Sequence, residues 1–168
     1  MNIPKAIEGA LAAAFVENMD LDMLPRIRTF QAPDIDGRWT TLDDRVFPML
    51  FIVAAPPSTS PDEGWTQICQ SSILVATQAD DDQDHSTIAG IYSEAQKVLD
   101  NLISQFIAQT AGAVRNSFDM YLSDKAPVEY AAISIGGFSA GDGLSPYEEG
   151  GNNFIGMTFN VHYSRSDY

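Results

Sequence analysis

The sequence predicts an α+β fold, a single mixed, mostly antiparallel β-sheet with helices packed on one face. The first observation is an amphipathic helix over residues 86–106. Its apolar side chains recur at three- and four-residue spacing: Ile88, Ile91, Tyr92, Ala95, Val98, Leu99, Leu102 and Phe106. The second observation is that strand-like segments lie on both sides of this helix in the sequence. Because such a helix must bury its apolar stripe, we expect it to lie on a sheet built from both sets of strands.

Length and composition indicate one domain, residues 1–168. The chain is 45% hydrophobic and 19% charged, which is enough for one core. The single cysteine, Cys69, lies in an apolar stretch, so we expect a small buried side chain and no internal disulfide. No apolar run approaches the ~20 residues of a membrane span. Residues 1–16 are typical of a helix rather than a signal peptide.

The net charge is −14, from 23 acidic and 9 basic residues. A conventional DNA- or RNA-binding surface needs clustered Lys and Arg, so this balance argues against one. Two interpretations remain. The charge serves solubility, or it belongs to a surface that repels nucleic acid or meets a basic partner.

Residues 1–19 are predicted to be helical, because Ile3, Ile7, Leu11 and Phe15 share a face in an Ala-rich segment. Pro4 fits the first turn, where a missing N–H costs little.

The segment after this helix alternates between strands and loops. Residues 26–32 alternate apolar and polar side chains, which predicts a strand. Residues 33–44 are a polar turn region, and Asp36-Gly37 suits a hairpin tip. Residues 47–55 are a dense apolar run typical of a buried central strand, and the proline-rich residues 56–64 are predicted to be a loop.

Residues 65–79 are predicted to be a long strand that bends near Ser71-Ser72. The acidic residues 80–85 then lead into the helix at Ser86, where carboxylates and the serine can cap free N–H groups.

After the long helix, residues 114–122 are predicted to be a short helix closed by Pro127. We expect a strand at 128–138 and a flexible polar loop at 139–152. The last strand, 153–163, alternates cleanly. One face carries Ile155, Met157, Phe159, Val161 and Tyr163, and the other carries Gly156, Thr158, Asn160 and His162.

A G-x-S-x-G string at 137–141 is the sharpest catalytic match. In α/β-hydrolases this string places a serine on a turn between strand and helix. Ser139, Asp142 and His162 occur in the order of a catalytic triad, but the residues that follow Ser139 are typical of a loop. We therefore expect a Gly/Ser loop between two strands rather than an enzyme.

The acidic run Asp80, Asp82 and Asp84 has the spacing that begins a calcium-binding loop. Such a loop needs Gly at its sixth position and Glu at its twelfth, whereas this chain has His85 and Ile91. The run therefore predicts a solvated turn that caps the helix.

The remaining ionisable residues supply no further site. The two histidines stand apart in sequence, no zinc-binding spacing occurs, and Glu148-Glu149 lies in a glycine-rich segment poorly suited to acid–base chemistry. The sequence therefore predicts no catalytic residues, no metal ligands and no cofactor.

The order of segments resembles the tail terminator (tail completion, or head–tail joining) proteins of long-tailed bacteriophages. The matching features are an opening helix, the strand FPMLFIVAA, the strand WTQICQSSILVATQA, the acidic link DDDQDH, the helix IAGIYSEAQKVLDNLISQF and the closing strand NFIGMTFNVHYSR. The resemblance covers most of the chain and consists of order and composition rather than diagnostic residues.

The resemblance implies a structural virion protein that forms a homo-oligomeric ring, expected to be a hexamer. The ring would cap the tail-tube protein and join it to the head–tail connector or stopper protein, with DNA passing through an acidic lumen. By physical argument, sheet edges and the polar segments 33–44, 56–64 and 139–152 are candidate contacts. The alternative is an acidic binding module such as a DNA mimic, with carboxylates at phosphate-like spacing along one face.

Overall fold

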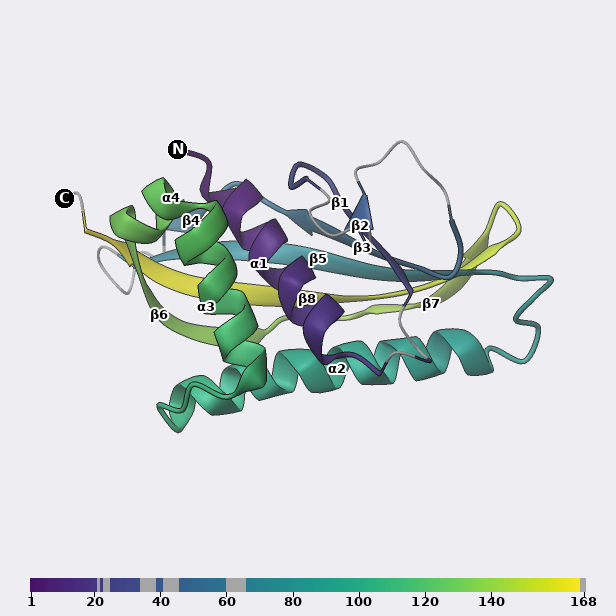
Figure 1. The fold of residues 1–168 in the computed structure, drawn as a ribbon. Coiled ribbons are helices and arrows are strands. Elements are labelled where there is room, and N and C mark those ends of the chain that lie inside the picture. The colour runs from purple at the N-terminus through teal and green to yellow at the C-terminus, as the bar shows by residue number, and fades with distance from the viewer. Residues whose placement is uncertain (21, 23–24, 34–38, 41–45, 60–65, 167–168) are drawn as a thin grey trace.

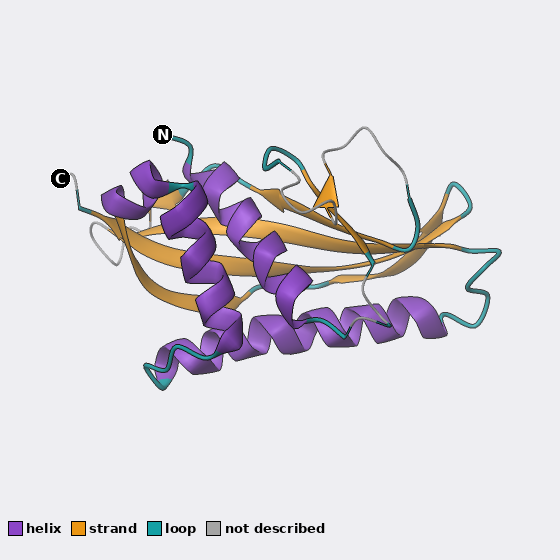
Figure 2. Cartoon of the chain, viewed as in Figure 1, coloured by secondary structure: helices purple, strands orange, loops and turns teal. Residues whose placement is uncertain are grey.

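The computed structural model describes residues 1–20, 22, 25–33, 39–40, 46–59 and 66–166, and it confirms the α+β class. The helices are α1 (Ile3–Asn18), α2 (Ser86–Ile107), α3 (Ala113–Lys125) and α4 (Pro127–Ala132). The strands are β1 (Arg26–Thr29), β2 (Trp39–Thr40), β3 (Met49–Ala54), β4 (Ser58–Thr59), β5 (Thr66–Gln78), β6 (Ile133–Ala140), β7 (Leu144–Glu149) and β8 (Asn152–Arg165). The helices gather on one side of the sheet (Figure 2).

The sheet is built on the ladder between β5 and β8. The main strand order is β2-β1-β3-β5-β8-β6, with β4 also paired to β5 and β7 also paired to β8. The pairs of β1 with β2 and β3 are parallel and the others are antiparallel. At about 3.3 Å per residue, the 13 residues of β5 span roughly 40 Å. The pairing of β5 with β8 runs through Ser71 and Ser72 without a shift, so the predicted bend does not interrupt the ladder.

Helix α1 is buried on almost every side because it packs on the sheet and against α3, which lies beside it (Figure 1). The predicted apolar face is confirmed, but Ala6, Ala12 and Val16 are buried as well. Gly9 allows the close approach of α3, because a Cβ there would lie 2.0 Å from the Tyr121 hydroxyl oxygen. Helix α1 is therefore a core helix rather than a surface amphipathic one.

A buried carboxylate ties α1 to the neighbouring strands. Glu8 has no exposed surface. Its Oε1 accepts hydrogen bonds from the backbone N–H of Gln31 (2.8 Å) and Ala32 (3.3 Å). Its Oε2 accepts one from the N–H of Ala54 at the end of β3 (3.1 Å). Three backbone donors are satisfied by one side chain, as burial of polar groups requires.

Helix α2 begins and ends as predicted, and its start is capped by an acidic residue of the preceding turn. Asp82 is buried and accepts hydrogen bonds from the N–H groups of Thr87 (3.0 Å) and Ile88 (3.1 Å) and from the Thr77 hydroxyl (2.9 Å). Ser86 instead donates to Asp84. The predicted capping role of the acidic run is therefore confirmed.

We expect Asp82→Asn to destabilise the protein in a pH-dependent way. Burial raises the pKa of Asp82, but hydrogen bonds donated by Thr87, Thr77 and Ile88 outweigh it, so this pKa is below its usual range. The stability that the ionised group contributes is present above the unfolded pKa of about 3.9 and is lost as pH falls through the lower folded pKa. In thermal melts, the melting temperature of Asp82→Asn should be lower than that of wild type at neutral pH, and this difference should become smaller below about pH 4.

Asp100→Asn is the matched control, because Asp100 is exposed on α2 and no described residue bonds its carboxylate. Its melting temperature should equal that of wild type at every pH. If the difference in melting temperature between Asp82→Asn and wild type did not change with pH, the ionised Asp82 carboxylate would not be the group that stabilises the start of α2.

The predicted strand at 128–138 is wrong in its first half. Pro127 opens α4, where its fixed φ suits the first turn, and β6 begins only at Ile133. Val128 and Tyr130 are 65% and 50% exposed on this helix.

The predicted loop at 139–152 is also wrong. Residues Leu144–Glu149 form β7, which is exposed throughout and pairs with β8. Gly150 and Gly151 make the intervening turn with φ of 60° and 78°, which glycine adopts without strain.

Two further predictions concern segments that are described only in part. The predicted strands on either side of residues 33–44 correspond to β1 and β3, which pair in parallel, so they do not form a hairpin. Asp36-Gly37 itself lies outside the described residues. In the predicted loop at 56–64, β4 pairs with β5, and residues 60–64 lie outside the described part.

Cys69 is fully buried on β5, which confirms its predicted place in the core. Burial, and then the negative charge of Glu8, raise the pKa of its thiol to about 12. Among the residues that the structure describes, no helix is both long and apolar enough to cross a bilayer.

Candidate functional site, an uncovered sheet face without carboxylates

Acidic residues are excluded from most of the sheet. Of the described strands, only β7 contains Asp or Glu. The other described carboxylates lie on the four helices, on the turn at residues 80–84 and in short connections. In a chain of net charge −14, the sheet is therefore the region in which negative charge is lowest.

Side-chain alternation separates the two faces of the long strands. Cys69, Ile73 and Val75 of β5 and Val161 of β8 join the core beneath the helices. The neighbouring residues point to the other side, on which no described helix packs (Figure 2). We call this side of β3, β5, β6 and β8 the open face; Glu149 of β7 lies on the same side at its edge, opposite Asn152. The polar members at the centre of the open face are Gln70, Ser72, Ser134, Ser139, Thr158, Asn160 and His162.

The polar side chains of the open face form cross-strand pairs. Gln70 lies opposite Asn160, and Ser72 lies opposite Thr158. Gln70 and Ser72 are exposed, and their partners on β8 are half-buried. Facing amides and hydroxyls can hydrogen-bond either to each other or to a partner protein. This strip of the open face is polar but uncharged.

Apolar side chains continue the open face over β3 and β5. Phe51 lies opposite Leu74, and Val53 lies beside Ser72. These three apolar side chains are half-buried although no described helix covers them. A face that mixes apolar and uncharged polar side chains, with charges depleted, has the composition of a protein–protein interface core.

Ser139 and His162 meet on the open face. Ser139 Oγ lies 2.8 Å from His162 Nε2, and Asn160 Nδ2 donates to Ser139 Oγ at 3.4 Å. Two members of the possible triad are thus brought together across β6 and β8. Asp142 is not the third member, because it is the Asp142 backbone carbonyl that accepts a hydrogen bond, from the Thr158 hydroxyl (2.7 Å).

The setting of Ser139 differs from that of a nucleophilic serine. Ser139 lies within β6, whereas a nucleophile elbow places its serine between a strand and a helix. No described residue is seen to orient His162 through its other ring nitrogen. The Ser139–His162 pair is therefore best explained as part of the polar surface of the open face.

The other predicted candidates do not converge. The carboxylates of Asp82 and Asp84 are engaged at the start of α2, and Glu148 and Glu149 are exposed on β7. Within the described part of the chain, no group of three His, Cys, Asp or Glu side chains is placed to hold a metal ion.

The sequence alone does not reveal the open face, although it carries part of the signal. The alternation at 153–163 correctly assigned Thr158, Asn160 and His162 to one side of the strand. Which face of the sheet stays uncovered depends on the face against which α1 and α3 pack, and local sequence patterns do not determine this packing. Of the predicted strands, only the one at 128–138 contains an acidic residue, Glu129, so most of this lack of carboxylates can be seen in the sequence.

Similarity to known proteins is found among solved structures. No family model matches the sequence, and no curated protein matches it. Among solved structures, a similar chain comes from the virion of a native gene transfer agent particle. The alignment covers 92% of this chain and 93% of that chain, with a TM-score of 0.34 and 12% sequence identity.

Proposed function

We propose that this chain is a structural protein of a bacteriophage tail or neck. In this proposal it forms a homo-oligomeric ring, expected to be a hexamer, that caps the tail tube and joins it to the head connector. It acts by docking and carries out no chemical reaction. The proposal rests on the resemblance in segment order and, above all, on one structural observation, the open face without carboxylates.

The open face has the size and composition that a docking surface needs. The strands β3, β5, β6 and β8 together cover on the order of 600 Å², from a rise of about 3.3 Å per residue and a strand spacing of about 4.8 Å. A standard interface buries about 800 Å² per partner. Because an unpaired carboxylate is costly to bury, a face without carboxylates is the surface of this chain best suited to desolvation. We assign this face to contact with the end of the tail tube.

The carboxylates on the helices and turns have a complementary role in this proposal. DNA that passes through a channel must slide without binding, and negative walls repel its phosphates. We propose that acidic residues outside the open face line the channel.

The alternative function, an acidic module that mimics DNA, is less well supported by the geometry. Along α2, the exposed helix side carries Glu94 and Asp100, which lie roughly 9 Å apart along the axis. Glu94 is moreover paired with Lys97 at 2.9 Å. Two such groups over 22 residues do not reproduce a phosphate backbone.

Light scattering on a sizing column, followed by negative-stain electron microscopy, tests the proposal. We expect particles several times the 18.3 kDa mass of one chain, with a central hole. A monomer that neither associates with itself nor binds purified tail tubes would overturn the proposal. Stoichiometric labelling of Ser139 by a fluorophosphonate would contradict the expectation that no reaction is catalysed.

A further inference from the structure

A pocket at one end of the molecule is lined by two of the three lysines. It has a volume of about 260 Å³ and lies between the start of α1 and the end of α3. Lys5 and Lys125 line it together with Asn2, Pro33 and Tyr121. Because these residues come from distant parts of the sequence, only the fold brings the two ammonium groups to one place.

Neither of these two lysines has a partner within the described chain. Both are exposed, and neither ammonium group makes an ion pair or hydrogen bond with a described residue. The third lysine, Lys97, is paired with Glu94. The nearby carboxylate of Glu129 is already engaged, because it accepts the Asn2 N–H at 2.8 Å. In a chain with 23 acidic residues, two unpaired lysines beside one pocket indicate a site for an external carboxylate.

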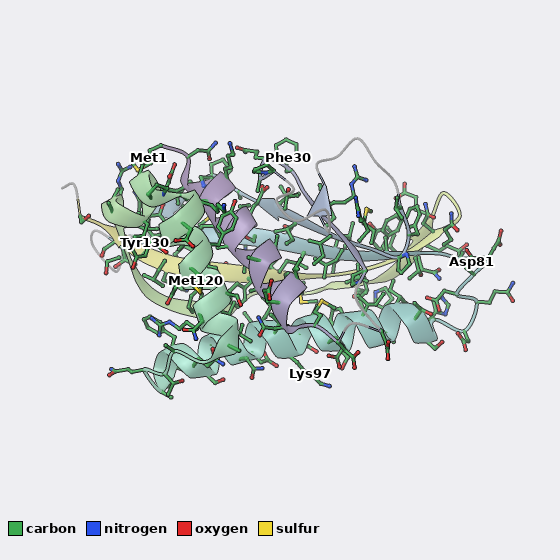
Figure 3. The ribbon with its side chains drawn as sticks, in the orientation of Figure 1. Met1, Phe30, Asp81, Lys97, Met120 and Tyr130 are labelled. Atoms are coloured by element: carbon green, nitrogen blue, oxygen red, sulfur yellow. The ribbon has the colours of Figure 1, made fainter. Side chains whose placement is uncertain are left out.

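Free carboxylates lie at the opposite end of the molecule. Within the turn between β5 and α2, Asp82 and Asp84 bond the start of the helix, whereas Asp80 and Asp81 are exposed and bond no described residue through their side chains. Figure 3 shows Asp81 at one end of the long sheet and Met1, next to the start of α1, at the other. The 13 residues of β5 separate the two ends by roughly 40 Å.

We propose that copies of this chain join head to tail, with Asp80 and Asp81 of one copy seated against Lys5 and Lys125 of the next. This inference rests on the proposed ring and identifies the two surfaces that build it. The contact joins two different surfaces, so it can repeat from copy to copy rather than ending at a dimer, and it closes into a ring when the rotation between neighbouring copies divides a full turn evenly. It also leaves the open face of every copy free to dock onto the tail tube.

Charge reversal at either end should break the ring, and mixing the two variants should restore it. The variant K5E/K125E presents negative charge at both ends, and D80K/D81K presents positive charge at both ends. Each variant alone should associate at least about tenfold more weakly than wild type in sedimentation velocity, because like charges meet at every contact. In a mixture, both contacts between unlike copies are attractive, so an alternating ring should form. A hexamer accommodates that alternation because its number of subunits is even.

The controls separate this inference from the proposed function. K97E and D100K alter exposed charges on α2, away from both ends, and should leave the wild-type mass unchanged. Circular dichroism melts should show that all variants are folded. The head-to-tail contact would be overturned if both charge-reversal variants formed rings as wild type does, or if mixing the two variants did not restore association. Neither result would overturn the proposal that the wild-type chain forms a ring. Absence of any wild-type association would overturn the proposed function itself.

Discussion

Under the proposed function, the double substitution Gln70→Glu and Asn160→Asp will strongly weaken docking onto tail tubes. The two side chains lie directly opposite each other on β5 and β8, so the substitutions place two carboxylates side by side in the centre of the open face. Each new side chain is isosteric with the old one, and Gln70 is exposed in the free subunit, so folding should change little. Docking, in contrast, must desolvate both charges. We expect binding to weaken by at least about 100-fold, since burying like charges costs several kcal/mol.

Gln96→Glu with Asn101→Asp is the matched control for that double variant. It adds the same two charges at exposed positions of α2, on the opposite side of the sheet. Cosedimentation with tubes assembled from the tail-tube protein of the same particle measures both variants. The control should sediment with tubes as wild type does. If the two double variants bound tubes equally well, the open face would not be the docking surface.

The substitution Glu8→Ala will cause the largest loss of stability among the changes considered for this chain. Without the carboxylate, the backbone N–H groups of Gln31, Ala32 and Ala54 are left without their acceptor inside the protein. The donors of Ala32 and Ala54 are buried, whereas Gln31 is exposed and its N–H can bond water. Each unsatisfied buried donor costs about 1–3 kcal/mol, so we expect a total loss of roughly 3–5 kcal/mol. Urea unfolding followed by circular dichroism measures this loss in the free energy of unfolding.

Glu17→Ala controls for charge and helix propensity in the Glu8 experiment. Glu17 lies on the same helix but is exposed, so its removal should change the free energy of unfolding by less than about 0.5 kcal/mol. Glu8→Gln keeps one acceptor oxygen and should fall between the two. A loss for Glu8→Ala no larger than that for Glu17→Ala would show that the three N–H groups find other acceptors.

The elements with strong periodicity were predicted well from sequence, and those defined by tertiary pairing were not. Helix α2 and strand β8 each carry a regular apolar pattern over more than ten residues. Strand β7 has no such pattern, because it is exposed on both faces and is held by its pairing with β8. The segment 128–138 is predicted as one strand because it is rich in apolar side chains, but its first five residues belong to the short helix α4, on which Val128 and Tyr130 are exposed.

The candidate surfaces could be predicted only in part, for the same reason. The alternation of β8 identified the side chains of the open face, but the packing of α1 and α3 decided that this side stays uncovered. The lysine pocket joins residue 5 to residue 125, and nothing in the local sequence links them. In the sequence, Glu8 is one polar residue of an Ala-rich helix, and its role cannot be predicted because its three backbone donors come from distant segments.

The place of β8 in the sheet has a consequence for the timing of assembly. This strand is the shared partner of β5, β6 and β7, and it follows all of them in the chain. During synthesis, β5, β6 and β7 are therefore made before β8, their shared partner. The surface that spans β5 and β8 forms only after β8 has paired with β5. For the proposed function, this order means that an incomplete chain lacks the surface proposed to dock onto a tail tube, so only complete subunits can dock.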